Sequence, residues 1–128
     1  MEIKNRNTII MESIDALVRK AFIEIPKMPD STKAIERIYI AELYTIDGVD
    51  HIFSFYCIPP HEYGDDGLNK MMFGCELCIP SRGSAFSHPL MYESKDDVIK
   101  NLYKGETKDK IFKKFLFLFE GFDKYCSD

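Results

Sequence analysis

The chain has 128 residues, 45% of them hydrophobic, which is enough for one domain with a core that needs no disulfide bonds. Its 17 basic and 21 acidic residues give a net charge of −4, which argues against nucleic acid or an anionic membrane surface as the main partner. No apolar run approaches the ~20 residues that cross a bilayer, and the start of the chain lacks the apolar stretch of a signal peptide. We therefore expect a single cytoplasmic domain over residues 1–128.

Residues 7–22 are predicted to form an amphipathic helix, with Asn7 as its N-cap. Two prolines within residues 25–31 end the helix and lead the chain toward a sheet. The apolar side chains of the helix recur at helical spacing and should face the core: Ile10, Ile14, Leu17, Val18 and Ala21.

A β-hairpin is the clearest local prediction. Two runs rich in β-branched and aromatic residues, 34–46 and 49–58, flank the dipeptide Asp47-Gly48, which favours a type I′ turn. Pairing Ile46 with Val49 sets the register. One face then carries Ile38, Ile40, Tyr44, Val49, Phe53, Phe55 and Cys57, and the other carries Tyr39, Leu43, Ile52, Tyr56 and Ile58. Because both faces are rather apolar, we expect the hairpin to be central in its sheet.

The remainder of the chain predicts two further strands and two helices. Residues 70–79 form a third strand, and residues 84–92 form a fourth that Pro89 restricts to an edge. Ser94 should begin a helix that Gly105 stops. Thr107 should cap a last helix with a stripe of Phe112, Phe115, Phe119 and Phe122. The fold class is α+β: an antiparallel sheet of about four strands built on a central hairpin, with an N-terminal helix and two C-terminal helices packed on it.

Four cysteines raise the possibilities of redox chemistry and zinc binding. Cys75 and Cys78 form a C-x-x-C pair, but the pair lies inside an apolar, strand-like run, where positions three apart point to opposite faces. A zinc site would need a second pair of ligands, and only Cys57, His61 and His88 could supply it. Buried, reduced thiols are the favoured interpretation.

The segment "PPHEYGDDG" at 59–67 is the most distinctive loop. It belongs to an acidic middle region, 28–93, whose four basic and ten acidic side chains give a charge of −6. Tyr63 is a rigid anchor among carboxylates, a composition suited to docking in a cleft lined by Lys and Arg. His61 beside Glu62 could alternatively belong to a hydrolytic site, although no nucleophile or phosphate-binding loop accompanies it.

In size, acidity, α+β layout and acid-and-aromatic loop, the chain resembles the small immunity proteins that neutralise bacterial toxins, including those of contact-dependent inhibition systems. The resemblance implies a non-catalytic inhibitor without cofactor or metal, whose partner is a basic toxin domain, often a nuclease. From charge, the predicted partner-binding residues are Asp47, Asp50, Glu62, Tyr63, Asp65 and Asp66. The alternatives are a phage anti-defence inhibitor, a secretion chaperone, and a small metal or thiol hydrolase that uses His61 and Glu62 or Cys75 and Cys78.

Overall fold

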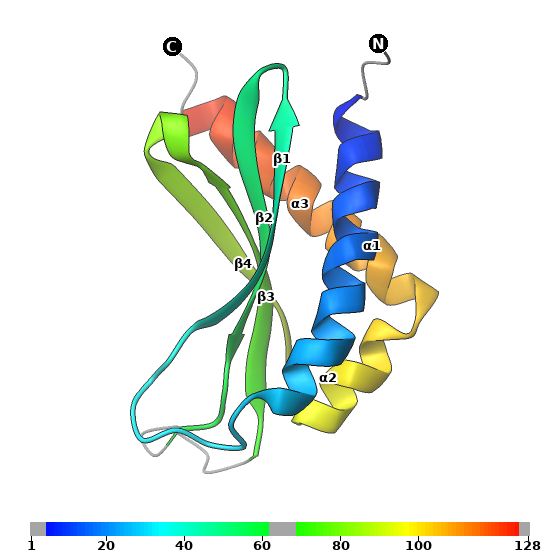
Figure 1. The fold of residues 1–128 in the computed structure, drawn as a ribbon, viewed down its shortest axis with the longest axis vertical. Coiled ribbons are helices and arrows are strands. Elements are labelled where there is room, and N and C mark those ends of the chain that lie inside the picture. The colour runs from blue at the N-terminus through cyan, green and yellow to red at the C-terminus, as the bar shows by residue number, and fades with distance from the viewer. Residues whose placement is uncertain (1–4, 62–68, 126–128) are drawn as a thin grey trace.

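The computed structural model describes residues 5–61 and 69–125. Helix α1 (Arg6–Glu24) is followed by a short 3₁₀ turn (Ile25–Lys27) and by four strands: β1 (Ile38–Ile46), β2 (Val49–Ile58), β3 (Met71–Ile79) and β4 (Ser84–Glu93). A second 3₁₀ turn (Pro80–Arg82) joins β3 to β4, and helices α2 (Lys95–Leu102) and α3 (Gly105–Tyr125) follow. This arrangement confirms the predicted α+β fold class (Figure 1).

The four strands form an antiparallel meander in the order β1-β2-β3-β4. Ile46 pairs with Val49 across the turn, and Asp47 and Gly48 both have positive φ, as a type I′ turn requires. The predicted register is therefore confirmed, and so is the edge position of β4, the strand that contains Pro89. The prediction that the hairpin is central holds only for its second strand: β2 is internal, next to β3, whereas β1 is the other edge strand.

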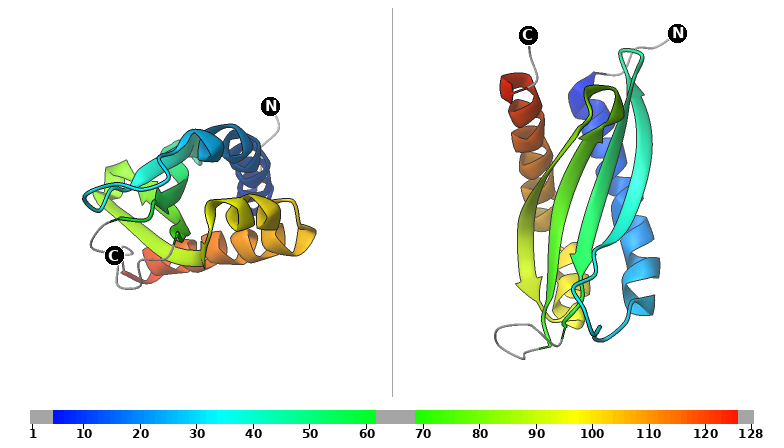
Figure 2. Two further views of the ribbon diagram at one scale, coloured as in Figure 1. Left: turned by 90° about the horizontal axis from the view of Figure 1, so that it is seen from below. Right: turned by 90° about the vertical axis from the view of Figure 1, so that its left-hand side faces the viewer.

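All three helices cover the same face of the sheet, as the two views in Figure 2 show. The core lies between the helices and the inward side chains of β1, β2 and β3. Three phenylalanines of α3, spaced along its buried stripe, pack against the sheet; Phe53 on β2 contacts Phe115 and Phe119, with ring centroids 5.3 and 5.9 Å apart. The fully buried aromatic side chains are Phe53, Phe55, Phe73, Phe115, Phe119 and Phe122.

Several helix ends differ from the sequence-based predictions. Helix α1 is capped two residues earlier than predicted: the side chain of Asn5, rather than that of Asn7, accepts the hydrogen bond from the Thr8 N–H, at 2.8 Å. Ser94 caps α2 as expected, accepting from the Asp97 N–H at 3.2 Å. Gly105 does not stop α2 but begins α3, and Thr107 is a buried residue of its first turn. The connection between α2 and α3 is consequently very short.

Candidate functional site

The helices leave one face of the sheet uncovered. We call this the open face; it carries Tyr39, Ala41, Leu43, Thr45, Asp50, Ile52, Ser54, Tyr56, Ile58, Met72, Gly74, Glu76, Cys78, Ala85, Ser87, Pro89 and Tyr92. The register aligns these residues in rows across the strands, the first of which is apolar throughout: Leu43, Ile52, Cys78 and Ala85. The last row, Ile58, Met72 and Tyr92, is also apolar. Figure 2 shows this face of the sheet toward the viewer in its right-hand view.

Large apolar side chains on the open face are accessible to solvent. Leu43 is 61% exposed, Tyr39 47% and Tyr92 43%. The solvent-facing side of an antiparallel sheet is usually polar, with apolar residues alternating to the core side. Large apolar side chains that gather on an exposed face mark an interaction site in a folded protein. The apolarity that suggested a central hairpin in the sequence therefore belongs to an uncovered face.

A polar cluster interrupts the apolar surface at its centre. The guanidinium group of Arg37 stacks over the Tyr56 ring, with Arg37 Cζ 4.3 Å from the ring centroid. The Glu76 carboxylate accepts from Arg37 Nη1 and from the Tyr39 hydroxyl, each at 3.4 Å. Burial under this cluster leaves Tyr56 only 3% exposed and raises the pKa of its hydroxyl. The cluster offers a partner one cation, one anion and the exposed ring of Tyr39 in a fixed arrangement, while Tyr56 supports Arg37 from below.

Gly74 is required by the position of the Tyr56 ring. The two residues face each other across β2 and β3, and a Cβ added at Gly74 would collide with the side chain of Tyr56. A glycine inside a strand commonly marks such a close approach. Because Gly74 has no side chain, the Tyr56 ring can lie across the backbone of β3. Arg37 stacks on the outer face of this ring.

The predicted binding residues that the structure describes lie at one end of the open face. Asp47 is in the hairpin turn, and the Asp50 carboxylate accepts from the Thr45 hydroxyl at 3.1 Å. Both side chains belong to exposed residues. The other predicted residues, Glu62, Tyr63, Asp65 and Asp66, lie outside the described residues. Strand β2 ends, and β3 begins, at the end of the sheet opposite to the hairpin turn (Figure 1).

The three cysteines in the described residues occupy both faces of the sheet, and Cys126 lies outside the described residues. Cys57 and Cys75 are buried on the helix-covered face, and burial raises the pKa of each thiol to about 12. Cys78 lies on the open face and is half-buried. Because Cys75 and Cys78 point to opposite sides of β3, they cannot hold one zinc ion or form a disulfide together. Within residues 5–61 and 69–125, no cluster of three His, Cys, Asp or Glu side chains is placed to hold a metal.

The three histidines are far apart in the fold. His51 is buried against Phe119, and its Nδ1 lies 2.8 Å from the Val49 carbonyl, which fits a packed strand residue. His88 lies beside α3, where Lys114 Nζ is 2.7 Å from its Nδ1. His61 forms an isolated parallel bridge with Thr32, next to the hydrogen bond from the Thr32 N–H to the Pro60 carbonyl. Glu62, the other member of the predicted hydrolytic pair, is outside the described residues.

Sequence reasoning did not find the polar cluster of the open face. The hairpin register already placed Tyr39 opposite Tyr56, so this half of the cluster could have been found. Glu76 could not, because the pairing of β2 with β3 depends on a long connection that sets no register by itself. Arg37 precedes β1 and reaches the cluster only through its long side chain.

No protein-family model matches the chain, and no curated protein or solved structure is significantly similar to it. None of the helices in the described part of the chain is long and apolar enough to cross a membrane.

Proposed function

We propose that the chain is a non-catalytic inhibitor of the immunity type, which binds a cognate bacterial toxin domain and blocks its active cleft. The observation that carries the proposal is the open face: a largely apolar sheet surface, with a preformed polar cluster at its centre, that none of the three helices in the described residues covers. A partner that covers this surface would remove its apolar side chains from water, and this burial would favour binding.

The size of the open face suits a protein partner. The face spans four strands; strands spaced about 4.8 Å apart, with about nine residues rising about 3.3 Å each, cover on the order of 600 Å². Specific protein complexes bury about 800 Å² on each partner. The open face together with its rim therefore provides an interface of ordinary size. Tyrosine and arginine, two of the residue types that dominate binding energy at interfaces, stand at its centre.

The charge at the hairpin end favours a basic partner. Asp47 and Asp50 are exposed carboxylates at the border of the apolar rows. A toxin nuclease must attract a phosphate backbone and so presents Lys and Arg around its cleft. Carboxylates at the rim of the interface would speed the encounter with such a surface and would fix its orientation.

The state of the buried thiols also favours binding over thiol catalysis. A nucleophilic cysteine acts as the thiolate and has a lowered pKa. Burial instead raises the pKa of Cys57 and Cys75 to about 12, so both remain protonated near neutral pH. Their contribution is to the packing of the core.

The test compares one charge substitution on each side of the molecule. Leu43→Asp places a carboxylate in the first apolar row, and Ile23→Asp places one on α1, at a site that is 59% exposed against 61% for Leu43. Tagged wild-type protein is cross-linked in native lysate, and the captured partner is then expressed alone and together with this chain. We expect a partner that arrests growth alone, rescue by the wild-type chain, and an affinity lowered at least about tenfold by Leu43→Asp only. The proposal would be refuted by a partner that does not arrest growth, or by an equal loss of affinity for the two variants.

A secretion chaperone is the second candidate, because an exposed apolar sheet face also suits the capture of an extended, unfolded segment. The same experiment separates the two functions. A chaperone would recover a secreted substrate that does not arrest growth, whereas a phage anti-defence inhibitor would recover a host defence protein.

A further inference from the structure

The outer edge of β1 is a second, separate feature of the sheet. In an antiparallel hairpin, alternate residues direct their N–H and C=O groups toward the partner strand. With Ile46 and Val49 as the pair that closes the turn, Tyr39, Ala41, Leu43 and Thr45 direct theirs away from β2. The hydrogen bond of 2.9 Å that the Ala41 carbonyl accepts from Lys20 Nζ agrees with this orientation. Four of the nine residues of β1 thus direct backbone donors and acceptors to the outer edge of the sheet, where the Ala41 carbonyl already accepts from Lys20.

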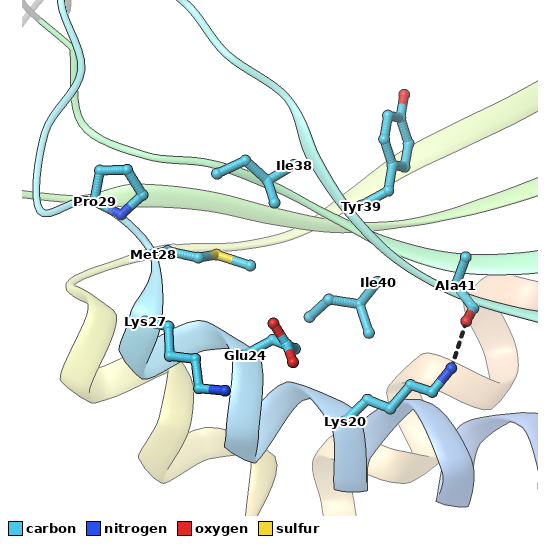
Figure 3. A pocket seen from close by; sticks show the side chains of 9 residues that line it. All are labelled: Lys20, Glu24, Lys27, Met28, Pro29, Ile38, Tyr39, Ile40 and Ala41. Atoms are coloured by element: carbon cyan, nitrogen blue, oxygen red, sulfur yellow. Dashed lines mark hydrogen bonds between the residues drawn. The ribbon is translucent and has the colours of Figure 1, made fainter.

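A groove of about 500 Å³ runs along this edge, between the first half of β1 and the C-terminal half of α1. Figure 3 shows Ile38, Ile40 and Met28 pointing into the groove, while Tyr39 points away from it toward the open face. Lys20, Glu24 and Lys27 line the opposite wall, from α1 and the turn that follows it. The groove therefore has an apolar floor, a strand edge on one side and an excess of positive charge on the other.

We propose that this groove binds an extended peptide segment of another protein, which pairs with β1 as a fifth strand. The segment would place one apolar side chain over Ile38, Ile40 and Met28, and a carboxylate two residues away within reach of Lys27 or Lys20. Main-chain hydrogen bonds to Tyr39, Ala41 and Leu43 would supply affinity, and the pocket would supply selectivity. This site uses the edge and α1 rather than the open face, so it stands independently of the proposed inhibitor function.

A second copy of this chain does not fit the same edge. Helix α1 packs against β1 and lies beside its free edge at the start of the strand (Figure 2). Two copies joined edge to edge would bring two α1 helices to a separation near the strand spacing of about 4.8 Å. Packed helices need about 8–10 Å. A lone extended segment carries no helix beneath it and avoids this clash.

Lys20 controls entry to the edge. Its Nζ caps the Ala41 carbonyl and also pairs with the Glu42 carboxylate at 3.0 Å. Lysines on edge strands are a common protection against uncontrolled strand pairing. An incoming strand takes over the Ala41 carbonyl while Lys20 retains Glu42 or moves to a carboxylate of the peptide. Lys20 thus disfavours pairing with an arbitrary strand and favours a peptide that has an acidic residue near this position.

The test uses a phage-displayed library of linear nonapeptides, selected against the wild-type protein and measured as synthetic peptides. Ala41→Pro removes an outward N–H without removing a hydrogen bond to β2, and proline is tolerated on edge strands. Ala85→Pro is the matched control, an exposed alanine on the opposite edge strand that also lies on the open face. We expect enriched peptides with alternating apolar residues and at least one carboxylate. Their affinity should fall at least about tenfold with Ala41→Pro, because main-chain bonds are lost, and less than about twofold with Ala85→Pro.

Amide hydrogen exchange of the wild-type protein supplies a readout that does not depend on a variant. The N–H groups of Tyr39, Ala41 and Leu43 should exchange fast in the free protein and slowly with a selected peptide bound. Three results would overturn the proposal: no enrichment of any linear peptide, bound peptides that leave these amides unprotected, or protection that arises from self-association in sedimentation experiments. Since the inhibitor function is tested by Leu43→Asp and growth rescue, either proposal can fail while the other stands.

Discussion

The two faces of the sheet are built from similar residues and yet have different surroundings. The face toward the helices buries Phe53, Phe55 and Phe73 completely, in contact with α1 and α3. The open face presents Leu43 and Tyr39 to solvent. An apolar side chain stabilises the fold only where another layer covers it, so the same residue types support folding on one face and are available for binding on the other.

Truncation of one large side chain on each face should separate these roles most strongly. Phe53→Ala removes a fully buried ring that contacts Tyr44, Phe115 and Phe119, and should cost about 3–5 kcal/mol of unfolding free energy. Leu43→Ala removes a side chain that is 61% exposed and should cost less than about 1 kcal/mol. Urea unfolding monitored by circular dichroism measures both values. Similar losses for the two variants would mean that the open face is covered in the free protein.

A smaller loss of stability is expected at Gly74, where the Tyr56 ring packs against the backbone of the open face. In Gly74→Ala, the added methyl group collides with the Tyr56 ring and must displace it from under Arg37. Overpacking of this kind costs about 1–3 kcal/mol. The same unfolding experiment should show this loss, together with a shift in the absorbance or fluorescence of the displaced tyrosine.

Two further variants test whether the loss at Gly74 comes from this contact. Gly105→Ala is the matched control, because nothing lies within 4 Å of the added Cβ, and it should change stability by less than about 0.5 kcal/mol. Tyr56→Ala combined with Gly74→Ala should cost less than the sum of the single changes, since the clash requires both side chains. Strict additivity would contradict the stacked arrangement of the cluster.

The parts of the fold that were predictable from sequence depend on local chemistry. Asp47-Gly48 sets a two-residue turn, and this turn determines the pairing of β1 with β2 residue by residue. The phenylalanine spacing of α3 similarly identifies its buried stripe. The order of the strands was predicted less well, because an apolar pattern on both faces of a hairpin does not distinguish a covered face from an uncovered one.

The candidate site was harder to predict because it depends on long-range pairing. Glu76 meets Arg37 and Tyr39 only after β3 has paired with β2, across a segment whose register no short turn sets. The edge groove needs α1, which is distant from β1 in sequence, to lie beside it. Asp47 and Asp50, predicted from charge as binding residues, lie at the hairpin end of the sheet, and their role in binding stays a prediction. Charge counting could not detect an apolar surface that the helices of the described residues leave uncovered.

The smallest predicted difference between the two faces concerns their cysteines. A buried thiol on the covered face should make the free energy of unfolding fall at alkaline pH. Burial raises the pKa of Cys57 and Cys75 to about 12, and for Cys75 the nearby Lys114 opposes part of this shift. A thiol in the unfolded chain loses its proton at about pH 9. The folded state therefore holds protons that the unfolded state releases, so the stabilisation is complete below about pH 9 and is lost as the pH rises toward about 12. The slope is at most about 1.4 kcal/mol per pH unit for each thiol.

Urea unfolding at pH 8 and pH 10 measures this slope for two matched variants. Cys75→Ala removes a thiol from the covered face, so its loss of stability between the two pH values should be smaller than that of the wild type by about 1.4 kcal/mol. Cys78→Ala removes a half-buried thiol from the open face and should retain most of the wild-type pH dependence. Tyr56, whose pKa burial also raises, contributes to the pH dependence of all three proteins; Cys75 is a lesser cause of that shift, so Cys75→Ala also slightly reduces the contribution of Tyr56. If the two variants had the same pH dependence, Cys75 and Cys78 would share one environment, and the assignment of β3 to a covered and an open face would be wrong.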